Sequence, residues 1–219
     1  SHAAFVELVR AAATSDVLAG FGARIRDLES RGGVFCRPTV LDDAHRDGNP
    51  ALLLRGAWHP LLTLYLPPRE VVRNDLDLGC GGGERESPHS SRNTTTSGTL
   101  VLTGPNMGGK STLLRLSALC AVMAQLGCRA PCLEMAFTPF DRVFTRMGAE
   151  DMLVEGRSTF LVELQDAARA LDHATRRSLV ILDELGRGTS THDGVAIAGG
   201  VLRYLHRNTC LLYTSPSPR

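Results

Sequence analysis

The sequence lacks several features that mark whole classes of protein. It contains no stretch of about 18 apolar residues, so we predict no transmembrane helix. No charged segment followed by an apolar one opens the chain, as a secretory signal peptide would. The net charge is +1, without the excess of basic residues that accompanies direct binding to nucleic acid. The composition therefore gives no sign of a membrane span or of a DNA-binding surface.

The cysteines also lack a recognisable pattern. None of the six belongs to a C-x-x-C pair, and Cys128 and Cys132 have no histidine partners at the spacing of a zinc site. We therefore predict reduced, mostly buried thiols in an intracellular protein. Hydrophobic residues make up 43% of the 219 residues, a globular composition with room for one domain and part of another. The helical pattern is already under way near Ser1, which favours a piece of a longer protein.

One stretch carries a specific motif. Residues 104–111 (GPNMGGKS) fit G-x-x-x-x-G-K-[ST], the phosphate-binding P-loop. A short apolar run at 98–103 precedes the motif and a run rich in Leu and Ala at 111–126 follows it, so we predict a strand, a glycine loop and a buried helix. In that arrangement the loop N–H groups and the helix N-terminus face a polyphosphate. Lys110 would reach the β- and γ-phosphates, and the Ser111 hydroxyl would bind Mg²⁺. The alternative, an ordinary glycine-rich turn, is disfavoured by this context.

A second stretch complements the first. The apolar residues 179–182 run directly into Asp183 and Glu184. An acidic residue at the end of a strand beside the P-loop strand can hold Mg²⁺, usually through water, and a second carboxylate can polarise the attacking water. We assign Asp183 to the metal and Glu184 to the general base. Two solvated acids in a strand-end turn are the alternative, which the P-loop about 70 residues upstream disfavours.

The segment 156–160 (GRSTF) leaves two interpretations open. Small polar residues stand at the start of a predicted helix, an end that attracts anions. The segment is either a capped helix or the source of Ser158 for the γ-phosphate bound by a neighbouring subunit.

The wider pattern indicates the fold class. Strands alternate with helices along the chain, which favours an α/β fold with a parallel sheet at its centre. Residues 79–97 consist mainly of Gly, Ser, Thr, Asn and charged residues, so we predict a flexible surface insertion between two strands.

Four runs resemble the MutS family of DNA mismatch-repair ATPases, in the family's order and spacing: residues 103–112, 141–149, 156–160 and 182–190. The resemblance covers roughly residues 15–205. Residues 121–128 (AVMAQLGC) further resemble the eukaryotic mispair-sensing subunit, MutS homologue 6 or its plant relative 7.

This resemblance implies a P-loop NTPase of the ABC type, with a mixed, mostly parallel sheet flanked by helices. Residues 1–30 would end a helical lever domain, and residues 31–208 would form the ATPase domain, truncated and carrying the 79–97 insertion. The family continues into a strand that leads to a Thr-His-Tyr switch. Here residues 209–219 resemble adapter read-through instead, so we predict a non-native tail and exclude it from the fold.

The resemblance also implies ATP and Mg²⁺ as ligands and assigns roles to individual residues. Glu184 and Lys110 would be catalytic, and Ser111 and Asp183 would bind the metal. Residues that act at the interface with a partner subunit would be Ser158, Arg187, Gly188, Thr189 and Ser190. The residues in contact with ATP would be Gly104, Pro105, Asn106, Met107, Gly108, Gly109, Lys110, Ser111 and Thr112.

The implied function is ATP binding and hydrolysis at a composite dimer site, coupled to recognition of mismatched DNA and to movement of a clamp. The partners would be a second MutS-family subunit and mismatched duplex DNA bound by domains outside this sequence, and the location would be the nucleus if the protein is eukaryotic. Two alternatives stay open. One is a MutS relative in recombination or another ABC-type ATPase, and the other is a nucleotide-binding module that does not turn over.

Overall fold

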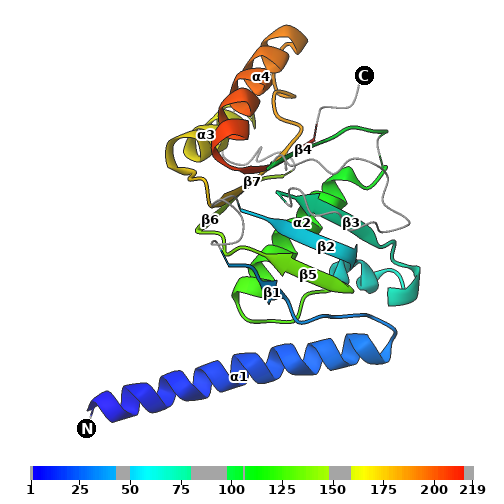
Figure 1. Cartoon of the computed structure of the whole chain (residues 1–219), viewed down its shortest axis with the longest axis vertical. Coiled ribbons are helices and arrows are strands. Elements are labelled where there is room, and N and C mark those ends of the chain that lie inside the picture. The colour runs from blue at the N-terminus through cyan, green and yellow to red at the C-terminus, as the bar shows by residue number, and fades with distance from the viewer. Residues whose placement is uncertain (1, 43–49, 80–97, 106, 148–158, 215–219) are drawn as a thin grey trace.

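The computed structural model describes residues 2–42, 50–79, 98–105, 107–147 and 159–214. Within these ranges, helices and strands alternate along most of the chain (Figure 1). In chain order the elements are α1 (His2–Ser30), β1 (Thr39–Val40), β2 (Leu52–Ala57), the 3-10 helices η2 (Pro60–Leu64) and η3 (Pro68–Glu70), β3 (Asn74–Leu78), β4 (Thr99–Leu102), α2 (Lys110–Gln125), β5 (Glu134–Phe137), β6 (Arg142–Arg146), α3 (Thr159–His173), β7 (Ser178–Asp183), α4 (Thr191–Asn208) and β8 (Cys210–Thr214).

The strands form two four-stranded sheets. The first has the order β1-β5-β2-β3, with β2 antiparallel to both neighbours and β1 parallel to β5. The second has the order β4-β8-β7-β6 and is parallel throughout. The α/β class predicted from the sequence is therefore confirmed, whereas the expected single sheet is divided in two. The division lies between β3 and β4: β3 pairs with β2 in the first sheet, whereas β4 pairs with β8 in the second.

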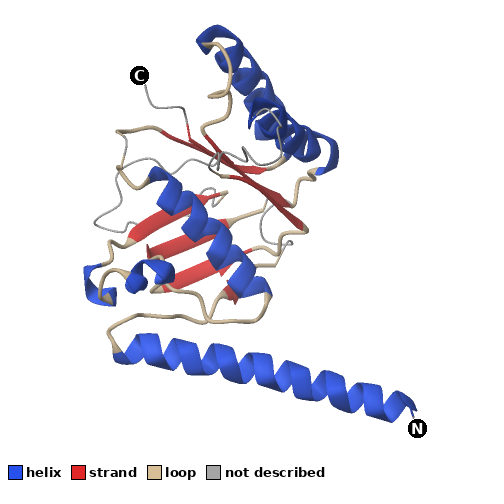
Figure 2. Cartoon of the chain, turned by 180° about the vertical axis from the view of Figure 1, so that it is seen from behind, coloured by secondary structure: helices blue, strands red, loops and turns tan. Residues whose placement is uncertain are grey.

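Helix α2 packs against both sheets. Its run of Leu and Ala favours a helix, which ends before Gly127 in the left-handed region at φ 78°. Figure 2 shows α2 lying across the face of the first sheet. Its buried residues share one core with side chains of β2, β3 and β5, and with Leu179 and Ile181 of β7. The helix that follows the predicted P-loop is thus anchored on two sides.

Strand β7 is buried on both faces. Leu179 and Ile181 point to the α2 side, whereas Val180 and Leu182 belong to a second core with residues of α3 and α4. All four side chains are at most 1% exposed. Successive side chains of a strand point to opposite faces. A strand that is covered on both sides therefore has apolar residues at consecutive positions.

Strand β8 contradicts one of our predictions. From the sequence we excluded residues 209–219 from the fold, but residues Cys210–Thr214 form a parallel strand between β4 and β7. The segment Cys-Leu-Leu-Tyr-Thr is mostly apolar and includes β-favouring residues, and it directly follows a helix that packs on the sheet. Tyr213 is 4% exposed and packs in the α3–α4 core. Residues 215–219 lie outside the described ranges, and the non-native origin of the tail stays a prediction.

Helix α1 is attached to the rest of the chain near its C-terminal end. Ile25 and Leu28 pack with Phe35, Trp58 and Val71 in a small core of their own. The Phe35 and Trp58 rings meet edge to face at 5.3 Å, and Trp58 Nε1 donates to the backbone carbonyl of residue 34 at 2.7 Å. None of the helices in the described ranges combines the length and hydrophobicity needed to span a membrane.

Asp141 joins the start of β6 to the turn before β7. Its carboxylate accepts hydrogen bonds from the Thr175 hydroxyl at 2.7 Å and the Ser178 hydroxyl at 2.8 Å. Burial raises the pKa of Asp141, but these two hydrogen bonds and the charge of Arg142 outweigh burial and leave the pKa below its ordinary value of 3.8.

We predict that Asp141→Ala lowers the free energy of unfolding by roughly 1 kcal/mol at pH 7, because two hydroxyl groups lose their acceptor. Since the folded-state pKa is depressed, the stabilisation is present above about pH 4 and lost as the pH falls through the folded pKa. Urea unfolding at several pH values measures both effects. Asp172→Ala, at an exposed position of α3, is the control, and an equal loss in both variants would contradict the prediction.

Candidate nucleotide site

The loop between β4 and α2 contains residues with a left-handed backbone conformation. Met107 has φ 63° and Gly109 has φ 84°, both in the left-handed region, which is uncommon for a residue with a side chain such as Met107. Gly109 is the N-cap residue of α2, and no side chain caps this end of the 16-residue helix. The positive end of the helix dipole therefore faces the loop, and no side-chain oxygen accepts a hydrogen bond from the N–H groups there.

Lys110 lies across this loop. Its Nζ donates to the carbonyl oxygens of Gly104 at 2.7 Å and Pro105 at 2.8 Å. The ammonium group is therefore held at the mouth of the loop, beside the N-terminus of α2. Ser111 and Thr112 follow in the first turn of the helix and are partly buried. A cation, a helix N-terminus and hydroxyl groups at one spot suit a polyanion with a bound metal ion.

The second sheet brings the two predicted motifs to the same edge. Leu102 at the end of β4 is in register with Thr214 of β8, and Thr214 is in register with Asp183 at the end of β7. The P-loop and Asp183 thus follow parallel strands with one strand between them. At about 4.8 Å per strand, the two strand ends lie roughly 10 Å apart. This spacing leaves room for phosphates and a metal ion between them.

The two acids differ in their surroundings. Asp183 is the partly buried last residue of β7, and Glu184 follows with φ 53°, outside the strand conformation. Glu184 accepts a hydrogen bond from Nη1 of Arg187 at 2.5 Å. Because the Arg187 side chain is 67% exposed, this ion pair contributes little stability and can open at small cost.

Comparison with known proteins identifies the family. Residues 100–215 match the family model of MutS domain V. The chain belongs to the MutS family. The predicted resemblance is therefore confirmed.

Several relatives carry names from DNA mismatch repair. Human DNA mismatch repair protein Msh6 is 47% identical over 178 residues, which are 80% of this chain and 12% of that protein. MSH7 of Arabidopsis thaliana is 45% identical over 172 residues, 78% of this chain and 15% of that protein. MutS of Syntrophobacter fumaroxidans is 45% identical over 172 residues, 78% of this chain and 17% of that protein. The MutS-family chain thus spans less than a fifth of the length of these three relatives.

The structure brings most of the predicted site residues of this MutS-family chain to one edge of the parallel sheet. The P-loop, Asp183, Glu184 and the loop 186–190 all follow the carboxyl ends of β4 or β7. Ser190 caps α4: its Oγ accepts from the Asp193 N–H at 3.2 Å and donates to Asp193 Oδ2 at 2.7 Å. Asn106 and Ser158 lie outside the described residues.

Sequence reasoning missed one residue beside this edge, Glu163 on α3. Its side chain is 4% exposed, and it accepts a hydrogen bond from the backbone N–H of Gly186. Gly188 packs against Phe160 in the same region, where a Cβ built on Gly188 would lie 3.0 Å from the Phe160 Cβ, a tight contact. Glu163 therefore anchors the loop after β7 to the helix that follows Ser158. The sequence places Glu163 between Phe160 and Ala167 on the buried side of the helix, but it gives no sign of the partner in the loop after β7.

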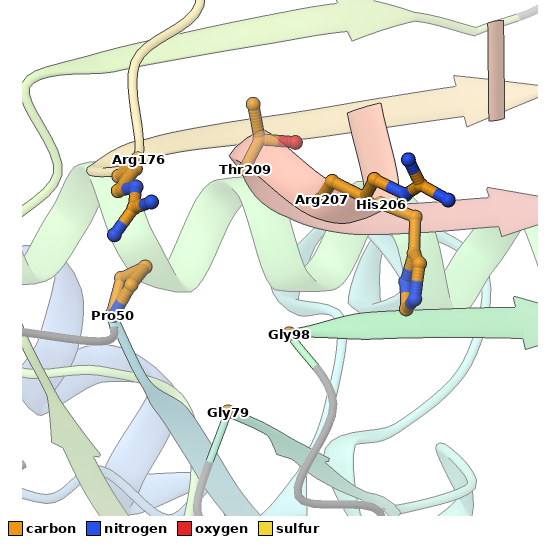
Figure 3. Close-up of a pocket in the computed structure, with 7 residues that line it drawn as sticks. All are labelled: Pro50, Gly79, Gly98, Arg176, His206, Arg207 and Thr209. Atoms are coloured by element: carbon orange, nitrogen blue, oxygen red, sulfur yellow. The ribbon is translucent and has the colours of Figure 1, made fainter. Parts of the chain in front are cut away.

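A separate cavity of about 240 Å³ lies at the opposite edge of the parallel sheet. Figure 3 shows its lining, which includes residues just before β4, β7 and β8. The His206 ring accepts from or donates to the Thr99 hydroxyl at 2.9 Å. The cavity is therefore distinct from the candidate nucleotide site, and none of the predicted site residues lines it: its lining is Pro50, Gly79, Gly98, Arg176, His206, Arg207 and Thr209.

The loop after β7 also touches the start of α4 through two glycines. A Cβ built on Gly194 would lie 2.3 Å from the carbonyl oxygen of Gly186.

We predict that Gly194→Ala destabilises the chain by about 1–3 kcal/mol, because the backbones must move apart. Gly200→Ala, in the same helix with nothing within 4 Å of its Cβ, should instead stabilise by about 0.5–1 kcal/mol. Thermal unfolding measures both, and equal effects would contradict the proposed contact.

Proposed function

We propose that this MutS-family chain is an ATP-binding and ATP-hydrolysing domain of a DNA mismatch-repair protein, with the P-loop NTPase fold of the ABC type. The observation that carries the proposal is the register Leu102–Thr214–Asp183, which sets a glycine loop and an acidic strand end at one sheet edge. The ATPase domain would begin at residue 31 and include strand β8, which ends at Thr214. Residues 1–30 would end a lever domain, which fits the exposure of apolar side chains such as Phe5 and Leu8 on α1.

The residues at the loop suit ATP and Mg²⁺. The uncapped N-terminus of α2 and the Lys110 ammonium supply positive potential for the phosphates. The Ser111 hydroxyl and the Asp183 carboxylate are oxygen donors of the kind that Mg²⁺ prefers. We infer that ATP contacts residues 104–112 and that Ser111 and Asp183 hold the metal. Bound Mg²⁺ would neutralise charge that develops on the phosphates.

Glu184 would act as the general base for the attacking water. It sits one residue beyond Asp183, and its positive φ turns the backbone away from the strand direction. In this structure its carboxylate is paired with Arg187. Since Arg187 is also a predicted interface residue, we infer that contact with a partner subunit moves Arg187 away from the Glu184 carboxylate.

Hydrolysis would require a second MutS-family subunit. Ser158 would approach the γ-phosphate bound by that partner, and the loop Arg187–Gly188–Thr189–Ser190 would cross the interface. Glu163 supports this inference, because it ties that loop to the helix that follows Ser158. Mismatched duplex DNA would bind to domains outside this sequence. In a eukaryote, the resemblance to the mispair-sensing subunit would place the protein in the nucleus.

A second candidate function is nucleotide binding without turnover. The Glu184–Arg187 ion pair favours it, because an engaged carboxylate is a poorer base for water. Single-turnover hydrolysis in the presence of a native partner subunit separates the two functions. Turnover that depends on Glu184 would exclude the second candidate.

Lys110 is the only lysine in the sequence, so its side chain is the only lysine amine that a chemical reagent can modify. We predict that Lys110→Ala weakens binding of ATP with Mg²⁺ at least about tenfold, because a charge-assisted phosphate contact is lost. Titration calorimetry measures this, with Arg115→Ala, an exposed position of the same helix, as the control. Acylation of Lys110 by an amine-selective reagent should also slow when ATP is present. Equal affinity of the Lys110 variant, or no binding by the unaltered chain, would refute the proposed site.

For Glu184 we predict a different outcome. Glu184→Gln should keep ATP affinity and lower the single-turnover rate with a partner subunit by about 10²–10⁴-fold, because the amide cannot accept the proton from water. Arg187→Ala should leave Glu184 in place and retain turnover that depends on Glu184. Rapid-quench assays measure these rates, and an unchanged rate in Glu184→Gln would rule out this residue as the base.

A further inference from the structure

Two thiols outside the nucleotide site lie side by side. The Sγ atoms of Cys36 and Cys132 are 3.3 Å apart, although the residues are 96 positions apart in the chain. Cys36 lies between α1 and β1, and Cys132 lies between α2 and β5. The backbone holds them in place, because Cys36 and Ala130 exchange two hydrogen bonds of 3.0 and 2.9 Å. Both thiols are free in the structure.

The two sulfurs have different access to solvent. Cys132 is fully buried, whereas Cys36 is only partly buried. Arg129 stands beside Cys36: it donates to the backbone carbonyl of Phe35 at 2.9 Å and pairs with Glu29 at 2.7 Å. A partly exposed thiol beside a cation and a second thiol is the usual setting of a reactive cysteine.

The two thiols also differ in pKa. The hydrogen bond between the two sulfurs lowers the pKa of Cys36 to about 7. Burial opposes the shift, while a backbone hydrogen bond from Met135 and the charge of Arg129 reinforce it. The hydrogen bond and burial raise the pKa of Cys132. Nearby Cys120 is buried, which raises its pKa to about 12 and keeps it a thiol.

We propose that Cys36 is a site of oxidation by hydroperoxides and that Cys132 is its resolving thiol. The Cys36 thiolate attacks one oxygen of the hydroperoxide, the O–O bond breaks, and the departing oxygen takes a proton and leaves as water or an alcohol. Cys36 is then a sulfenic acid. The Cys132 sulfur attacks the Cys36 sulfur, the S–O bond breaks, and the hydroxyl leaves as water with the Cys132 proton. The two thiols together supply the two electrons that the hydroperoxide accepts.

Formation of the disulfide needs only local movement. The S–S bond is about 2.05 Å long, so the sulfurs must approach by roughly 1.3 Å. The bond would join the segment after α1 covalently to the segment before β5. It would thus fasten the attachment of α1, which otherwise depends on a small core around Trp58. Within the described residues, no group of three or more potential ligands is arranged to hold a metal ion, so the thiols are not part of such a cluster.

The experiment treats the reduced 219-residue chain with hydrogen peroxide at pH 7, blocks remaining thiols by alkylation and digests the chain with trypsin. The peptides separate the cysteines. Cys36 falls in residues 32–46, since trypsin does not cut before Pro38; Cys132 falls in 130–142; Cys120 and Cys128 share 116–129. We expect one main cross-link, between peptides 32–46 and 130–142. The intact chain should lose the mass of two hydrogen atoms.

Matched variants make the test specific. Cys36→Ser should abolish the cross-link, whereas Cys128→Ser should retain it. Cys132→Ala should also abolish it and leave Cys36 as a sulfenic acid that a dimedone probe captures. The proposal is overturned if Cys36 stays reduced while the other cysteines oxidise. It is equally overturned if the cross-link forms only in urea, or if Cys132→Ala gives no trapped product at Cys36.

Discussion

The pairing of β8 between β4 and β7 is the constraint on which the candidate site depends. Backbone hydrogen bonds along both sides of β8 hold Leu102 and Asp183 in register, so the P-loop and the acidic strand end cannot drift apart. Both faces of this sheet are covered, by α2 on one side and by α3 and α4 on the other. Without the central strand, β4 would lose its partner in the sheet, and the loop after it would lose its fixed position relative to Asp183.

The loop after β7 is not held equally firmly along its length. The loop after β7 is anchored where it is buried, by the Glu163 carboxylate and by close backbone contact between Gly186 and Gly194. Farther along the same loop, Arg187 is exposed and its ion pair with Glu184 is weak. In the proposed function, a partner subunit that contacts the exposed part would move Arg187 without disturbing the buried anchor. The same helix carries Glu163 and begins just after Ser158, so both proposed interface elements share one support.

Several features were predictable because they depend on neighbours in sequence. The P-loop motif, the buried helix behind it and the apolar run into Asp183 are local patterns, and the structure has a strand, loop, helix and strand at those residues. Other features were not. The division into two sheets depends on which strands pair, and the strand at residues 210–214 was excluded although its apolar residues suit a central strand. Glu163 was passed over because a carboxylate on the buried side of a helix gains a partner only after folding.

The sequence by itself determined the chemistry available to this MutS-family chain: a glycine loop with its one lysine, two carboxylates at a strand end, and a set of cysteines. It determined these because motif spacing and residue type are local properties. Only the tertiary structure decided how the groups meet. It set the P-loop and Asp183 on either side of β8, paired Glu184 with Arg187, and brought Cys36 within 3.3 Å of Cys132. Contacts between residues distant in the chain follow from strand pairing and core packing, which no single stretch of sequence specifies.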